Sequence, residues 1–202
     1  MHFHNRARSA IGILKVGYSL LPVFIFVLII YAFDAPLFAT LTLICAALHE
    51  LGHIICIKCL GYKSSIRGVL SGPKIYIGTT VGYRHTVLIA LSGPLMNISL
   101  ALISLPFSAV LGDIATYFSL INVISAVCNL IPMVNNDGYN VLLSLINLRL
   151  DEYLAERIMT AVSLVFSSAL CIFSLYAMSR LNAAYWCYFL SMYLLVKGTR
   201  MS

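Results

Sequence analysis

The stretch LHELGH, residues 48–53, places two histidines and a glutamate inside an apolar run, with LTLICAA before it and IICI after it. His49, Glu50 and His53 fit the pattern H-E-x-x-H. Side chains four positions apart share one face of a helix, so both imidazoles can bind one metal ion. Glu50 then lies beside the metal, where it can accept a proton from a water molecule. Zinc suits this pattern because it favours nitrogen ligands in tetrahedral geometry.

The composition around this motif is that of a membrane protein. Of the 202 residues, 61% are hydrophobic and only 10% are charged, whereas soluble domains are about 45–50% apolar and about 25% charged. Apolar runs long enough to span a bilayer, which takes roughly 20 residues, lie at about 13–33, 36–58, 86–111, 114–131, 158–179 and 182–196. We therefore predict an all-α polytopic protein of six transmembrane helices, forming a single membrane-embedded domain over residues 1–202.

The distribution of positive charge predicts an orientation. If the N-terminus is cytoplasmic and six helices alternate, twelve of the thirteen Lys and Arg residues fall on the inner side and only Arg180 falls outside. The positive-inside rule expects this bias. It predicts a multi-pass protein with both termini cytoplasmic and the site toward that side. The compact chain suits a prokaryotic cell membrane. The net charge of +6 is then explained by the lipid surface rather than by nucleic acid.

A catalytic zinc needs a third protein ligand, and the acidic residues are few. Besides Glu50, five of the seven are placed in predicted outer loops or in a polar segment that reads as a solvated linker: Asp34, Asp113, Asp151, Glu152 and Glu156. Asp137 remains, in the stretch NLIPMVNNDGYN of residues 129–140. Pro132 should end a helix there, and Gly138 permits a tight turn. An ordinary interfacial turn is the alternative, but beside the two histidines Asp137 is the best candidate ligand.

Three motifs together resemble the site-2 protease family of intramembrane zinc metalloproteases. They are H-E-x-x-H at residues 49–53, G-P-x-x-N at residues 93–97, and N-x-x-P-x-x-x-x-D-G at residues 129–138. The likeness covers roughly residues 36–146, which would be the core, followed by C-terminal helices over 150–202. Val134 and Tyr139 depart from the second proline and the double glycine of many members, and there is no room for their regulatory domains.

The resemblance implies a role for each matching residue. Asp137 would be the third zinc ligand, beside His49 and His53, with one zinc per chain. Asn97, in the middle motif, would help to hold the substrate near the metal; a hydrogen bond that only bridges two helices is the alternative. Asn129 can satisfy its own loop or line the cleft, and we include it as a candidate substrate-binding residue.

Residues 63–84, KSSIRGVLSGPKIYIGTTVGYR, differ from the apolar runs around them. Short alternating and β-branched pieces broken by glycines predict a short β hairpin on the cytoplasmic side. An edge strand there could pair with an extended substrate. A hairpin that only covers the site is the alternative.

These features predict an intramembrane zinc metalloendopeptidase. Its partners would be the lipid bilayer and a membrane-embedded protein or precursor peptide, and a regulatory partner is left open. The substrate could belong to regulated intramembrane proteolysis or to peptide maturation. A membrane metal-ion transporter or sensor is one alternative, since intramembrane His and Asp also mark ion paths. An inactive protease-like scaffold is another, although the intact Glu50 argues against it.

Overall fold

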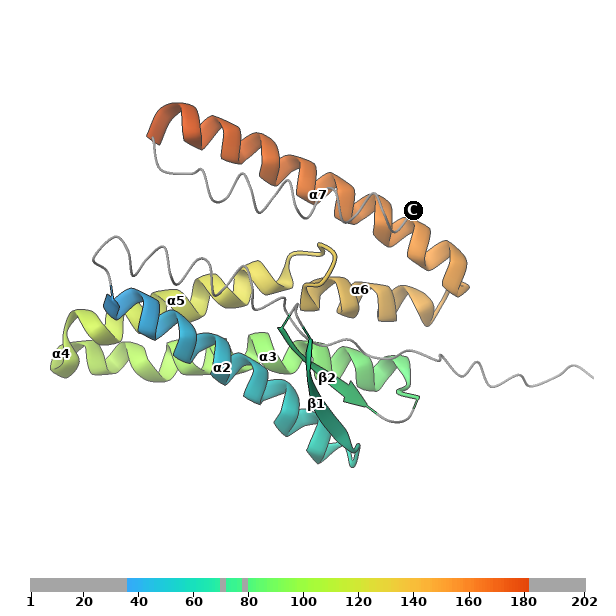
Figure 1. The fold of residues 1–202 in the computed structure, drawn as a ribbon, viewed down its shortest axis with the longest axis horizontal. Coiled ribbons are helices and arrows are strands. Elements are labelled where there is room, and N and C mark those ends of the chain that lie inside the picture. The colour runs from blue at the N-terminus through green and yellow to red at the C-terminus, as the bar shows by residue number, and fades with distance from the viewer. Residues whose placement is uncertain (1–35, 70–71, 78–79, 182–202) are drawn as a thin grey trace, which may run out of the picture.

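The computed structural model describes residues 36–69, 72–77 and 80–181. Figure 1 shows their order and arrangement. The elements are α2 (Pro36–Cys59), β1 (Ser64–Val69), β2 (Gly72–Ile77), α3 (Tyr83–Ser104), the 3-10 helix η1 (Leu105–Phe107), α4 (Ser108–Leu111), α5 (Asp113–Leu130), α6 (Asp137–Asn147) and α7 (Glu152–Leu181).

The described part of the chain is mostly helical, with four helical segments long and apolar enough to cross a membrane. These are Pro36–Cys59, Tyr83–Leu111, Asp113–Leu130 and Glu152–Tyr176. They match the predicted spans at 36–58, 86–111, 114–131 and 158–179. The other two, at 13–33 and 182–196, lie outside the described residues. The total of six, the orientation and the position of the termini therefore stay predictions.

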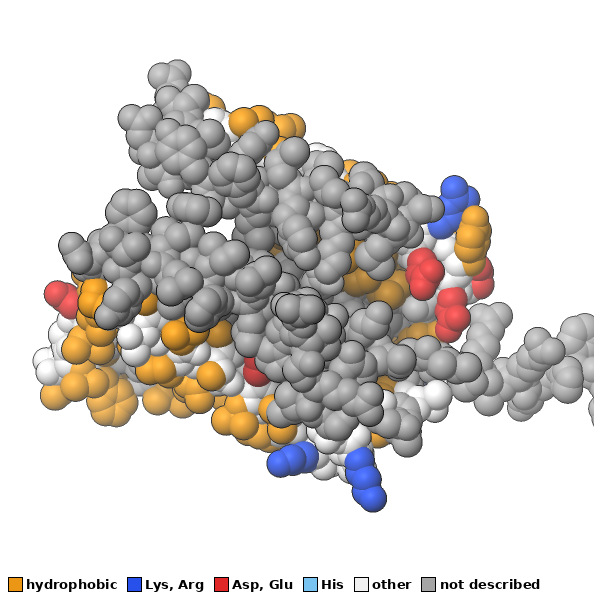
Figure 2. Space-filling model, viewed as in Figure 1, with side chains coloured by type: hydrophobic (Ala, Val, Ile, Leu, Met, Phe, Trp, Pro, Cys, Tyr) orange, Lys and Arg blue, Asp and Glu red, His pale blue; other side chains and the backbone are white. Residues whose placement is uncertain are grey.

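The side chains on the outside of these helices are largely apolar. Leu102, Val110 and Phe173 are among many large hydrophobic residues that are more than half exposed. Figure 2 shows apolar side chains over the described α2–α5 part of one face, with Lys and Arg at the edges. Such a surface is unfavourable in water and suits contact with lipid.

Helix α3 is central and packs against α2, α5 and α6 (Figure 1). It approaches α2 closely because a glycine lies at the contact. A Cβ on Gly52 would lie 2.7 Å from the Ser92 carbonyl oxygen and 2.9 Å from the Met96 Cβ. Small residues let the backbones of membrane helices come together in this way. The close contact holds the H-E-x-x-H motif of α2 against the G-P-x-x-N segment of α3.

The segment between α2 and α3 contains a β hairpin. Strands β1 and β2 are antiparallel, with pairs running from Ser64 opposite Ile77 to Val69 opposite Gly72. Ile77 belongs to a buried cluster with Ile57 of α2 and Ile89 of α3. The hairpin is thereby packed onto the ends of both helices that carry site motifs.

The segment after α5 differs from the prediction in two ways. Pro132 follows the end of α5 at Leu130 as expected, but a second helix, α6, begins directly at Asp137. Gly138 lies in the first turn of α6 and does not form the chain reversal. The residue with positive φ is Asn135, at 76°. Gly138 is required for a different reason, because a Cβ there would overlap the Leu130 carbonyl oxygen and lie 2.5 Å from its carbon.

The polar segment that contains Asp151, Glu152 and Glu156 was predicted to be a solvated linker, and from Glu152 onward that prediction is wrong. Those residues form the first turns of α7. Asp151 directly precedes α7, and its Oδ2 accepts from the Leu154 N–H at 3.3 Å. An acidic residue at a helix start satisfies free N–H groups and interacts favourably with the helix dipole.

Candidate metal centre

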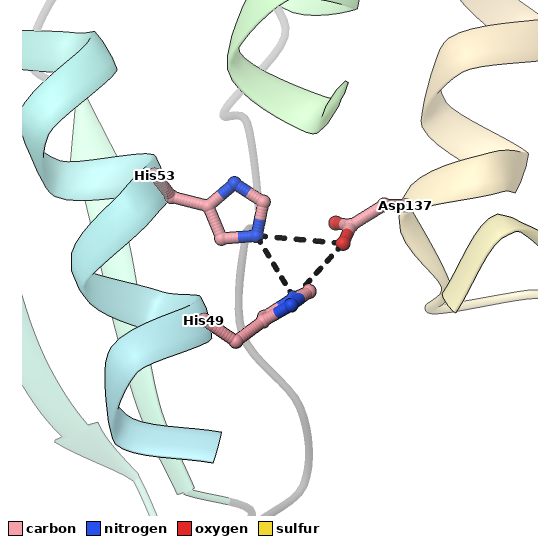
Figure 3. Close-up of side chains that lie close together, drawn as sticks. All are labelled: His49, His53 and Asp137. Atoms are coloured by element: carbon pink, nitrogen blue, oxygen red, sulfur yellow. Dashed lines mark hydrogen bonds and ion pairs between the residues drawn. The ribbon is translucent and has the colours of Figure 1, made fainter. Parts of the chain in front are cut away.

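Three buried side chains from two helices meet at one point (Figure 3). His49 Nε2 lies 3.0 Å and His53 Nε2 lies 3.4 Å from Asp137 Oδ2. The two Nε2 atoms are 3.2 Å apart. All three residues are at most 2% exposed. The structure thus brings together the three residues predicted to be metal ligands.

The distances fit a small tetrahedral cation. Zinc bonds to nitrogen and oxygen measure about 2.0–2.2 Å, which puts neighbouring ligands of a regular tetrahedron about 3.3–3.6 Å apart. The observed separations of 3.0, 3.2 and 3.4 Å are close to that range. Asp137 Oδ2 is also buried without a well-aligned hydrogen bond from any described residue. A buried carboxylate oxygen in that state is stabilised by a cation.

The ring of His53 is oriented by α3. Its Nδ1 lies 2.7 Å from the Ile89 carbonyl oxygen, an acceptor that requires the Nδ1 proton. In the neutral ring, Nε2 then keeps its lone pair, and this nitrogen is the one that lies near Asp137. Ser92 Oγ donates to the same carbonyl at 2.6 Å and lies 3.3 Å from His53 Nδ1. Metal-binding histidines are commonly oriented by such a bond from the other ring nitrogen.

Gly93 lies directly beneath the two imidazoles. A Cβ on it would overlap His53 Nε2 and would lie 2.7 Å from His49 Cε1. Only glycine leaves room for both rings at this position. In the sequence Gly93 is recognisable only as part of the G-P-x-x-N motif, because its contact with the imidazoles arises only when α2 and α3 pack together.

Glu50 is half-buried and follows His49 on α2. Its carboxylate interacts electrostatically with His53, His49 and Asp137. Glu50 is therefore close to the three candidate ligands without being one of the converging group. A general base has to lie near the water that it deprotonates, and Glu50 is the candidate for that role here.

Asp137 lies outside the four candidate spans, at the start of α6. Burial alone would raise the pKa of its carboxyl group. The contacts with His49 and His53 outweigh burial, and the net effect is a lowered pKa. Asp137 is thus held as a carboxylate, the form that binds a metal.

A search of solved structures finds a counterpart for this architecture. A site-2 protease from Methanocaldococcus jannaschii superposes with a TM-score of 0.67, over 90% of this chain and 88% of that chain, at 19% sequence identity. The chain has the fold of a site-2 protease. No protein-family model and no curated protein matches the sequence. A likeness at this identity establishes the fold, and the chemistry has to be argued from the residues.

Within this fold, Asn97 is buried between helices α3 and α5. Its Nδ2 donates to Ser125 Oγ at 2.8 Å, and its Oδ1 has no hydrogen-bond partner among the described residues. Asn129 is half-buried near the end of α5. Their assignment to substrate binding stays a prediction.

Proposed function

We propose that this chain is an intramembrane zinc metalloendopeptidase. It would hydrolyse a peptide bond within or near a transmembrane segment of a membrane protein or precursor peptide. The observation that carries the proposal is the convergence of His49, His53 and Asp137 beside Glu50. The membrane-type surface and the site-2 protease fold support it.

In the proposed site, His49 Nε2, His53 Nε2 and Asp137 Oδ2 hold one zinc ion per chain. Bound zinc would supply a Lewis acid for the substrate carbonyl and would lower the pKa of water. The hydrogen bond to the Ile89 carbonyl holds the His53 ring in the tautomer that keeps Nε2 available. Gly93 leaves the space in which both rings lie.

Glu50 would be the general base and then the general acid. It accepts a proton from water as the water oxygen bonds to the carbonyl carbon of the substrate. It then delivers that proton to the amide nitrogen as the carbon–nitrogen bond breaks. No covalent intermediate with the protein is needed, and no serine or cysteine nucleophile is assigned.

The remaining assignments belong to the same proposal. Asn97 and Asn129 would contact the substrate, and the buried Asn97 Oδ1 is an acceptor suited to a backbone N–H. The charge distribution supports a site toward the cytoplasm with both termini on that side. The β hairpin would offer an edge to an extended substrate.

Metal content and peptidase activity, measured on the full-length protein in detergent, test the proposal. We expect one zinc per chain in the wild type and in Glu50→Gln, but little in Asp137→Ala. Asp113→Ala is the matched control, because Asp113 also begins a helix but is exposed. Activity is measured on a set of synthetic transmembrane peptides in the same detergent.

Glu50→Gln should bind zinc normally and lose at least about a hundredfold in rate, the contribution typical of a general base. Glu156→Gln, at an exposed position, is its control. Full zinc content in Asp137→Ala would refute the ligand set. A Glu50→Gln protein as active as the wild type would refute the assigned role of Glu50.

A further inference from the structure

The loop that delivers Asp137 contains a tight turn over residues 133–136. The Asn136 N–H donates to the Met133 carbonyl oxygen at 3.0 Å. Asn135, the third residue of the turn, has φ 76°, and it is the only described non-glycine residue with positive φ. These are the features of a type II turn, in which φ is positive at the third position and close to −60° at the second. Val134 occupies that second position.

Val134 joins this turn to α7. Its N–H donates to Ser163 Oγ at 2.9 Å, across 29 positions of sequence, in a buried contact. Ser163 is completely buried. Because a buried N–H without an acceptor is costly, this bond fixes the turn at one point of α7.

A second contact joins the same elements. Val134, Tyr139 of α6 and Met159 of α7 form a buried apolar cluster. Met159 and Ser163 are four positions apart, so they lie on one face of α7. This face of α7 therefore contacts Val134, which precedes Asp137, and Tyr139, which follows it. Ser163 contributes the hydrogen bond and Met159 the apolar packing.

The turn is also tied back to α5. Asn136 Nδ2 donates to the Cys128 carbonyl oxygen at 2.8 Å. Gly138 lies against the Leu130 backbone. With α5 on one side and α7 on the other, the turn has little freedom to shift, and Asp137 follows it directly.

We propose that Ser163 of α7 is a positioning residue for the metal site, acting through the Val134 N–H to hold the turn that places Asp137. The inference rests on the proposed function in one respect, namely that Asp137 binds the metal. It makes α7 part of the metal site, although none of the three converging residues, His49, His53 and Asp137, comes from that helix.

The first test compares zinc affinity, measured by competition with a chromophoric chelator. Ser163→Ala should weaken zinc binding about tenfold, at the lower end of the effects seen when groups that orient metal ligands are removed. Ser174→Ala is the matched control. Ser174 is equally buried on α7, but its hydroxyl bonds to the Leu170 carbonyl of the same helix.

A rescue distinguishes positioning from general damage to α7. Proline fits the second position of a type II turn and has no N–H. Val134→Pro removes the group that needs Ser163, so the double variant Val134→Pro/Ser163→Ala should bind zinc more tightly than Ser163→Ala alone. Equal affinities in these two variants, or a loss in Ser174→Ala as large as that in Ser163→Ala, would overturn the proposal.

A second test does not depend on zinc. In metal-free protein, Ser163→Ala should speed amide hydrogen exchange of the peptide containing residues 133–136 at least about tenfold, because the buried Val134 N–H loses its acceptor, while Ser174→Ala leaves it unchanged. Unchanged exchange in Ser163→Ala would overturn the proposed support of the turn, whatever the metal does. Faster exchange in a protein that binds no zinc would retain that support and refute the proposed function instead.

Discussion

The two halves of the candidate metal centre are built in different ways. His49 and His53 come from one long helix, and their four-residue spacing alone puts them on the same face. Asp137 comes from the start of a short helix, behind a turn that depends on contacts with α5 and α7. The placement of both histidines on one helix face is therefore specified locally, whereas the placement of Asp137 depends on packing between distant segments. The two halves should respond differently to substitution.

Gly93→Ala should have the largest effect, because it disturbs the histidine half from outside its own helix. The added Cβ would occupy the space of the His53 ring. We expect zinc affinity to fall by about a hundredfold, the upper end for changes just outside the ligands. Isothermal titration calorimetry with zinc measures the affinities of the wild type and the variant.

Gly82→Ala is the control for Gly93→Ala, since a Cβ at Gly82 meets no atom within 4 Å. If Gly93→Ala bound zinc as tightly as the Gly82→Ala protein, the histidine rings would not depend on α3 as described.

Gly138→Ala should disturb the position of Asp137. We expect a smaller effect on zinc affinity than that of Gly93→Ala, but a clear loss of stability. Its Cβ would overlap the Leu130 carbonyl oxygen, so α6 has to move away from α5. Overpacking of this kind costs about 1–3 kcal/mol. Thermal unfolding in detergent, with and without zinc, should show a lowered midpoint and a smaller stabilisation by zinc. A midpoint unchanged from the wild type would contradict the close contact.

Ser92→Ala should have the smallest effect, because the Ile89 carbonyl still accepts the His53 Nδ1 proton. We expect zinc affinity to fall by only about two- to fivefold, below the usual range for groups that orient ligands. Ser99→Ala is the control, as Ser99 is exposed and bonds only to the Leu95 carbonyl of its own helix. A loss as large as that of Gly93→Ala would mean that Ser92, rather than Ile89, fixes the ring.

The same contrast explains what the sequence could predict. The four described spans follow from uninterrupted apolar length, and the end of α5 follows from Pro132. His49 and His53 follow from helical spacing. Asp137 could be selected because few acidic residues were available and because the three motifs resemble a known family.

The parts that escaped prediction depend on contacts between distant segments. Gly93 becomes part of the site only when α3 lies against α2, and no local pattern carries that information. Ser163 bonds to Val134 across 29 positions of sequence. Nothing in the sequence around a serine of an apolar helix indicates such a partner. Helix α6 was missed because its Asn- and Gly-containing start is typical of a turn. The linker prediction failed for a related reason, since polar residues can also form the first turns of a long helix.

The close approach of α2 and α3 at Gly52 and Gly93 restricts how a substrate could arrive. With backbone and imidazole atoms already in contact there, no extended chain fits between the two helices. Separating them would move the surface on which both histidine rings rest. In the proposed peptidase, a substrate would therefore have to reach the ligands from a side other than the one that Gly93 closes.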